Sequence, residues 1–248
     1  MCEEKSWRFR RKCTRRAGAF GIAISVTAAS VGFGSARADD AASKATALIQ
    51  SSTQAAEKFL RDPEWEALRN VLGGARAILI VPHDIAGGFL ITASGGDGIL
   101  LRRHGQDWSD PVFMHVRTVG VGLAVGAESQ SILTMVMTDA GVDSMISGVS
   151  QVGGSGSVAL ADLGVGGGGS GGSLSGGLQV LTVSTAKGLY AGSDIRGTKI
   201  SAQQAYNAAV YGSGFDIGST VAGMGGGVPA ASDLRAILSN AVAGAWGQ

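Results

Sequence analysis

Cysteine is nearly absent from this 248-residue chain, and its two copies, Cys2 and Cys13, both lie near the N-terminus. The remaining chain therefore has no thiol for a disulfide or a thiolate metal site. Proline is also scarce, with 4 residues against 41 Gly. Glycine interrupts runs of Val, Ile and Leu instead of forming a uniform low-complexity tract. We therefore expect a β protein that bends and turns at its glycines and is held together by its apolar core alone.

Residue patterns typical of catalysis are missing as well. The glycine-rich tract 164–177 matches the dinucleotide pattern G-x-G-x-x-G and, around Ser170, the nucleophile pattern G-x-S-x-G. Both patterns need a strand before them and a helix after them, which this tract does not supply. His83, His104 and His115 lack the helical spacing of metal ligands. The sequence predicts a protein that is not an enzyme and has no cofactor or metal site; a hydrolase using Ser170 has little support.

The first 38 residues have the pattern of a secretory signal. A basic segment at 5–16 precedes an apolar run at 17–34 and the small-x-small sequence Ala36-Arg37-Ala38. This order predicts cleavage after Ala38 and a periplasmic or exported mature chain. Arg15-Arg16 leaves both the general secretory and the twin-arginine routes open. The alternative is an uncleaved membrane anchor, but the run is rich in Gly, Ala and Ser and is weakly apolar for a membrane span.

Cleavage would change the net charge of the protein. Residues 1–38 carry 8 of the 20 Lys and Arg and 2 of the 19 Asp and Glu, which leaves 12 against 17 and a net charge of −5. Phosphate attraction supplies most non-specific affinity for nucleic acid, so an acidic chain without a basic tract is a poor nucleic-acid binder. Nucleic acid is therefore excluded as a partner.

Residues 40–72 have the pattern of two helices. In the first, residues of one stripe recur at spacings of three and four. They are Ala45, Leu48, Ile49, Ser52, Ala56, Phe59 and Leu60. Asp62-Pro63-Glu64 then predicts the start of a second, shorter helix, which Gly73-Gly74 ends. We expect both helices to cover one face of a sheet; the alternative is that the first lies on a membrane.

Short apolar runs closed by Gly, Pro or Asp predict consecutive strands. They lie at 78–81, 89–92, 99–101, 112–116, 119–126, 132–137, 158–160, 178–184 and 189–191. Glycines at 120, 122 and 126 would share one face of one strand, which favours strong bending. The predicted fold is α+β, with a strongly curved, mainly antiparallel, Gly-rich sheet or partly closed barrel, N-terminal helices packed on it and a few short helices between strands.

The second half of the chain predicts further elements. Asp139 can cap a short helix through Ile146, the tract 164–177 reads as a flexible loop or hairpin tip, and Ser201 with Gln204 forms a capping box for a helix through Val210. A domain at 39–212 would be followed by a Gly-rich linker and an amphipathic helix at 213–248. The apolar face of that helix is expected to dock onto the domain, a membrane or a partner. Its main residues are Leu234, Ile237, Leu238 and Trp246.

Five basic residues are candidates for binding lipid head groups. Arg102 and Arg103 directly follow an apolar run, while Lys187, Arg196 and Lys199 surround a turn between late strands. Arg binds phosphate as a bidentate donor and Lys binds it as a point charge, so a local cluster could hold head-group phosphates on an otherwise acidic protein. The alternative is that these residues only solubilise the ends of strands.

Six motifs occur in a fixed order and resemble one known family. They are Ala75-x-Ala77-Ile78-x-Ile80-x-Pro82, Gly87-Gly88-Phe89, Gly95-Gly96-Asp97-Gly98-Ile99-Leu100, Trp108-Ser109-x-Pro111-x-Phe113, Val121-Gly122-x-x-x-Gly126-Ala127, and Lys187-Gly188-Leu189-Tyr190-Ala191-Gly192 with Asn207-x-x-x-Tyr211-Gly212. Together they resemble the SYLF lipid-binding domain, from about residue 41 to residue 212. The tract 164–177 is richer in Gly than expected for that family, and the tail after Gly212 extends past the domain.

The resemblance implies a phospholipid-binding domain. Eukaryotic members bind phosphoinositides and other anionic lipids, some fungal members contact actin, and bacterial members are exported. We therefore expect a non-enzymatic, peripheral membrane protein of the cell envelope that binds anionic phospholipids. The alternative is an envelope scaffold that binds a protein partner through a sheet edge or the C-terminal helix. The lipid species, the leaflet and the oligomeric state stay open.

Overall fold

The computed structural model describes residues 33–61, 66–88, 91–121, 126–147, 151–154, 169–172, 180–185 and 195–246. It has the α+β fold that the sequence predicts, with one open nine-stranded sheet in this part of the chain. The strands are β1 Ala77–Gly88, β2 Ile91–His104, β3 Asp107–Trp108, β4 Val112–Val121, β5 Gly126–Val136, β6 Gln151–Gly154, β7 Gly169–Gly172, β8 Val180–Ser184 and β9 Ile195–Ala202. The helices are α1 Phe33–Arg61, α2 Glu66–Leu72, α3 Asp139–Ile146, α4 Gln204–Tyr211, α5 Ile217–Ala222, the 3₁₀ turn η3 Pro229–Ala231 and α6 Ser232–Trp246.

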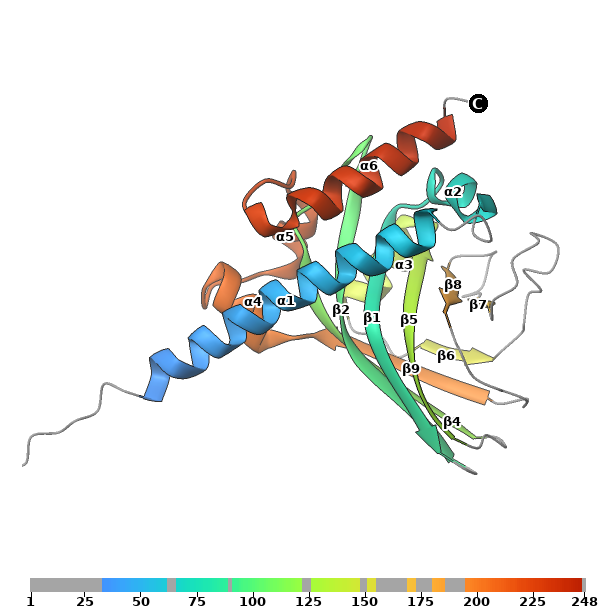
Figure 1. Ribbon diagram of the computed structural model, residues 1–248, viewed down its shortest axis with the longest axis horizontal. Helices are drawn as coiled ribbons and strands as arrows, with labels where there is room; N and C mark the ends of the chain where they lie inside the picture. The colour runs from blue at the N-terminus through green and yellow to red at the C-terminus, as the bar shows by residue number, and fades with distance from the viewer. Residues whose placement is uncertain are drawn as a thin grey trace, which may run out of the picture.

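The sheet is antiparallel at every pairing, in the order β6-β9-β4-β2-β1-β5-β8-β7, with β3 paired to β2. The central strands β1, β2 and β4 are long and bend along their length (Figure 1). Of the two predicted sheet forms, the curved open sheet is therefore confirmed for the described strands. The predicted strands at 158–160 and 189–191 lie outside the described residues.

Two layers of helices cover the sheet. On one face, α1 packs across β1 and β2 together with α4 and α6 (Figure 1). All seven stripe residues of the predicted first helix are buried, from Ala45 to Leu60, which confirms that this helix covers the sheet. On the other face, Val142 and Met145 of α3 and Val221 of α5 pack against a second cluster that includes Leu79 and Leu100. Successive residues of the central strands thus enter opposite cores.

The predicted strand boundaries are partly wrong. Residues 91–92 of the first run and the run 99–101 belong to one strand, β2, because the glycines between them continue the ladder instead of turning. Residues 89–90 lie outside the described part of the chain. An added Cβ at Gly96 would lie 2.3 Å from the carbonyl oxygen of His83. At Gly98 it would lie 2.7 Å from that of Ile80. These glycines allow β1 to approach closely, so they are a packing requirement and not a turn signal.

Strand β1 carries a bulge at the point of this close approach. Its register shifts against β2 between Ile80 and Ile85, and against β5 between Val81 and Asp84. Pro82 sits in the bulge, where its missing N–H costs no ladder hydrogen bond. The bulge also buries Asp84, whose Oδ2 accepts a 2.9 Å hydrogen bond from Gln130. A predicted strand therefore continues past its proline.

Three further predictions need correction. Gly120 lies in β4 and Gly126 in β5, so the run 119–126 is not one strand, and Gly122 lies outside the described residues. Ser201 continues β9 opposite His115, so the capping box at the start of α4 does not form. The region 213–231 contains α5 and η3, although a linker was expected.

Other predictions are confirmed. α3 spans the predicted residues, but its cap is Thr138, one residue before Asp139. The run 178–184 contains β8, and α6 begins at Ser232 as expected. Within the tract 164–177, residues 169–172 form β7 and pair with β8.

Candidate functional site

The sheet face that carries α1 is not covered along its whole length. Ile99 of β2 and Phe113 of β4 pack in the core beside α1. Side chains of a strand alternate between faces, so every second residue from these positions shares the α1 side. That rule places Asp97, His115, Arg117 and Val119 on this side, farther along the same strands.

The pairing of the strands identifies the neighbours of these residues. Arg117 pairs with Gly95 of β2 and with Lys199 of β9. Gly95 also pairs with Ile85 of β1, so Ile85 shares its face. Ile80 of β1 also faces α1, although five residues separate the two and regular alternation would put them on opposite faces. The bulge between them restores Ile85 to the α1 side. We call the four residues Ile85, Arg117, Val119 and Lys199 the open face.

The open face combines cationic and apolar groups. Ile85 is 66% exposed and Val119 is 55% exposed. Among the described residues, these are the large apolar side chains of the sheet that are exposed to solvent. Arg117 and Lys199 are exposed and directly opposite each other on neighbouring strands. Like charges directly opposite each other are destabilising in a sheet. Such a pair is therefore costly to the fold unless an anion binds it.

A polar network borders the open face. The His115 Nδ1 lies 2.6 Å from the Asp97 Oδ1, and Gln203 donates to the same oxygen at 3.2 Å. The Arg117 Nε donates to the His115 Nε2 at 2.8 Å. Burial first, and then the negative charge of Asp97, raise the pKa of Tyr206, so its hydroxyl keeps its proton at neutral pH. Asp97 and His115 are both partly buried under this network.

The network fixes the tautomer of His115. A guanidinium N–H only donates, so the Nε2 that receives the Arg117 hydrogen bond must carry a lone pair. The proton of the neutral ring then lies on Nδ1, where it is donated to Asp97. His115 thus holds Arg117 while it is itself held by Asp97.

This arrangement resembles part of a hydrolytic triad but does not complete one. Asp97, His115 and Ser201 are direct neighbours across three strands on one face. In a triad, the His Nε2 must accept the proton of the serine hydroxyl. Here the Nε2 accepts from Arg117 instead. The geometry therefore favours holding and orienting Arg117 over nucleophilic catalysis.

The predicted residues Arg102 and Arg103 lie at the opposite end of β2. Arg102 donates to Asp139 at 2.8 Å, and Arg103 donates to the carbonyl of Gly73. Burial, and to a smaller extent the charge of Arg76, lowers the pKa of Arg103. Both guanidinium groups bind the protein itself, where they join β2 to α3 and to the end of α2.

The other three predicted basic residues do not join that pair. Lys199 is level with Gly95, because both pair with Arg117. Gly95 is seven residues from Arg102 along β2, which is roughly 23 Å at the usual rise per residue. Arg196 lies on β9, where its backbone pairs with Gly120 and Gly153. Its side chain and all of Lys187 lie outside what the structure describes. Lys199 is thus separated from Arg102 and Arg103, and its neighbour is Arg117, which the sequence did not predict as a site residue.

The predicted apolar contacts on α6 mostly face the protein core. Leu234 and Leu238 are fully buried, and Ile237 is partly buried against the same cluster. The side chain of Trp246 lies outside the described residues. A membrane contact through Leu234 or Leu238 would therefore require α6 to leave the domain.

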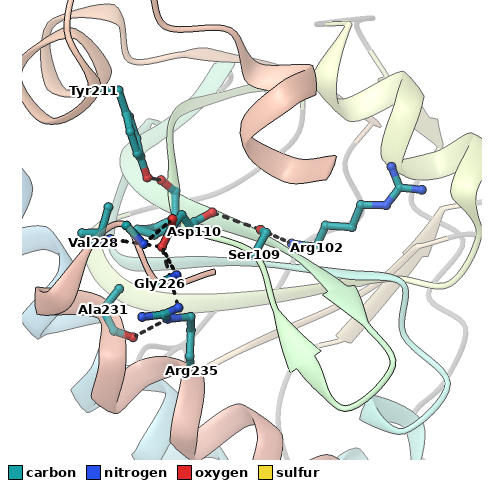
Figure 2. Close-up of polar contacts among 10 residues, drawn as sticks. Arg102, Ser109, Asp110, Tyr211, Gly226, Val228, Ala231 and Arg235 are labelled. Carbon is teal, nitrogen blue, oxygen red and sulfur yellow. Dashed lines mark hydrogen bonds and ion pairs between the residues drawn. The ribbon is translucent and has the colours of Figure 1, made fainter. Parts of the chain in front are cut away.

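A polar clamp holds the segment before α6 onto the sheet (Figure 2). The carboxylate of Asp110 accepts hydrogen bonds from the backbone N–H groups of Gly226, Gly227 and Val228 at 3.0, 2.9 and 3.2 Å. Arg235 of α6 lies 3.8 Å from the same carboxylate. Bonds to an ionised acceptor are stronger than neutral ones. The Asp110 clamp thus fixes α6 by electrostatics as well as by apolar packing.

Two other kinds of feature are absent from the described part of the chain. No group of three His, Cys, Asp or Glu side chains is placed to hold a metal ion there. Among the helices described, none has the length and apolar character needed to cross a membrane.

These features define an α+β domain with a curved sheet. On the α1 side of this sheet, helices cover one part, and the uncovered part carries exposed cations and apolar side chains. The model of the Ysc84 family, described as "Las17-binding protein actin regulator", matches residues 117–241, about half of the chain. The chain belongs to this family, whose domain is the SYLF domain, and the resemblance predicted from the sequence is confirmed.

Curated relatives support the same assignment. The "SH3 domain-containing YSC84-like protein 1" of rat and that of mouse are each 28% identical to this chain over 174 residues, 66% of its length. The match covers 51% of each relative, so the chain spans about half the length of these proteins. The bovine protein of the same name matches at the same identity. No solved structure matches the chain.

Proposed function

We propose that this protein binds anionic phospholipid membranes peripherally, without catalysis, through the open face of its sheet. The observation that carries the proposal is the composition of that face: Arg117 and Lys199 side by side, with Ile85 and Val119 exposed around them. Basic residues near an anionic bilayer contribute about 1 kcal/mol each. Exposed apolar side chains add stabilisation in the interfacial layer.

The location of the open face suits this role. Strands β1 and β2, and strands β4 and β5, approach their connections at the same end of the sheet, since Gly88 pairs with both Thr92 and Gly126. In Figure 1 this end projects away from α1, α2 and α6. A flat membrane could therefore approach the open face from that side without a clash with these helices.

We further propose that binding takes place in the cell envelope after export. The basic and apolar segment at 1–38 supports this location. The mature chain would carry a net charge of −5, so its attraction to an anionic membrane must be local to the open face. Salt should then weaken binding only moderately, because exposed charges are screened beyond about 8–10 Å while apolar contacts are not.

Co-sedimentation with vesicles tests the proposal. The protein is purified after export, its N-terminus is established by mass spectrometry, and it is mixed with vesicles of phosphatidylcholine alone or with phosphatidylglycerol. We expect sedimentation with the anionic vesicles and little with the neutral ones. Equal partition to both, or none to either, would contradict binding through a cationic face.

A second candidate is an envelope scaffold that binds a protein partner. The family description names a Las17-binding actin regulator, and relatives contain an SH3 domain, so both point to protein contacts in those proteins. In this chain the sheet ends in β6 and β7, whose outer edges are unpaired among the described strands. Failure of vesicle binding together with a specific envelope protein cross-linked at the edge strand β6 or β7 would favour the scaffold.

A further inference from the structure

The hydrogen bond between Arg117 and His115 connects the open face to a group that changes charge near neutral pH. Histidine is the side chain whose ordinary titration falls between pH 5 and 8. The Arg117 Nε donates to the His115 Nε2 at 2.8 Å, which is possible only while that nitrogen is unprotonated. Protonation would place an N–H opposite an N–H and a cation beside a cation. The bond between the two side chains would then be lost.

We infer that His115 positions Arg117 and that protonation of His115 ends this role. As a result, the protein binds anionic head groups more tightly as the pH falls. The inference rests on the proposed function of the open face. In its neutral form, His115 holds the guanidinium along the sheet. In its protonated form, it releases the guanidinium toward solvent and adds a positive charge beside Arg117 and Lys199.

The surroundings of His115 permit this change of charge. From β2, the Asp97 carboxylate accepts from Nδ1 at 2.6 Å in either state of the ring, so it keeps the ring in place and stabilises the cation. From β4 and β9, Arg117 and Lys199 oppose protonation in the free protein. A bound phosphate would neutralise these two cations and remove that opposition. Head-group binding and proton uptake are therefore linked and reinforce each other.

Tyr206, which the charge of Asp97 affects, and Lys44, whose charge acts on Tyr206, keep their charge state between pH 5 and 8. Burial and the charge of Asp97 raise the pKa of Tyr206, which therefore stays neutral. A hydrogen bond from Lys44 to Asp40 raises the pKa of that lysine, which stays cationic. Gln203 and Ser201 do not titrate in this range. Among the described groups around it, the His115 imidazole is therefore the one expected to change its charge.

The test is vesicle binding as a function of pH, with the processed protein and vesicles that contain phosphatidylglycerol. Its phosphodiester does not change charge between pH 5 and 8, so a pH effect must come from the protein. One added charge near an anionic surface corresponds to about a five-fold gain in affinity. We expect affinity to rise at least about five-fold from pH 8 to pH 5, and His115→Gln to give a flat profile. His83→Gln removes an exposed histidine outside the network and should keep the wild-type profile.

Calorimetry of wild-type binding in buffers of different ionisation enthalpy gives a second readout that needs no variant. We expect net proton uptake on binding near pH 6.5. A wild-type affinity that is independent of pH, binding without proton uptake, or a pH effect that persists in folded His115→Gln would overturn the inference while leaving lipid binding intact. Absence of binding to anionic vesicles at both pH values would overturn the proposed function and this inference with it.

Discussion

The two halves of the α1-side sheet face are built on the same strands but differ in burial and in charge. In the covered half, Ile80, Ile99 and Phe113 are fully buried under helices. In the open half, Ile85 and Val119 are exposed, with Arg117 and Lys199 beside them. The change occurs within five residues of β1, across the bulge at Pro82. The difference indicates that apolar packing is concentrated in the covered half, which leaves the other half available for the binding proposed above.

The largest effect should come from truncating the covered half. Phe59→Ala removes a fully buried aromatic ring from α1 and should lower the free energy of unfolding by about 3–5 kcal/mol. A smaller truncation on the open face, Val119→Ala, should alter it by at most about 0.5 kcal/mol. Urea unfolding of both variants measures this. Similar losses in both would mean that the open half is also part of the core.

The next effect concerns the Asp110 clamp, which belongs to the covered half. Asp110→Asn removes the charge that three backbone N–H groups and Arg235 bind, and should cost about 2–3 kcal/mol. Hydrogen exchange should increase in α6 more than in α3. Asp107→Asn, an exposed carboxylate at the neighbouring strand, serves as the control. Unchanged protection of α6 would show that apolar packing alone holds this helix.

The boundary between the two halves is tested at Gly96. Gly96→Ala places a methyl group 2.3 Å from a backbone carbonyl in the β1 bulge and should destabilise the fold by about 1–3 kcal/mol. Gly244→Ala in α6 meets no atom within 4 Å and should stabilise it by up to about 1 kcal/mol. Thermal unfolding of the pair measures the contrast. If Gly96→Ala were neutral, the bulge would not be fixed by close approach.

The smallest effect is expected at alkaline pH. Burial first, and then the charge of Asp110, raise the pKa of Tyr211 above its ordinary value of 10.0. Because the folded-state pKa is raised, the contribution of this hydroxyl is fully present below about pH 10 and is lost as the pH rises further. Tyr211→Phe should therefore be less stable than wild type at pH 8, since its hydrogen bond to Pro111 is lost, but should lose less stability between pH 9 and 11. Equal slopes in the two proteins would contradict this.

Local patterns predicted the covered half well. The stripe of α1 and the apolar face of α6 follow from helical periodicity, because burial under a helix layer demands apolar residues at regular spacing. The antiparallel sheet followed from short apolar runs. Those runs did not reveal that β1 and β2 continue through Pro82 and Gly96, because a proline in a bulge and a glycine at a close approach have the same residue types as turns.

The open face was harder to predict for the same reason. His115, Arg117 and Val119 alternate along β4, and this period of two would have placed them on one face. The prediction of separate strands at 112–116 and 119–126 interrupted the pattern, so Arg117 was missed. Lys199 was expected at a turn between late strands, but it lies within β9. Its pairing with Arg117 depends on strand order, which local sequence does not encode. The predicted roles of Arg102, Arg103, Lys187 and Arg196 in lipid binding stay predictions.

The measurement that tests the central claim most directly is vesicle binding by two charge-matched double variants. Arg117→Gln with Lys199→Gln removes both cations of the open face, and Lys58→Gln with Arg61→Gln removes two exposed cations of α1. At about 1 kcal/mol per charge, the first pair should weaken binding to phosphatidylglycerol vesicles by about 30-fold. The second pair should weaken it by no more than about three-fold. Equal losses in both would show that membrane attraction is diffuse and that the open face is not the binding site.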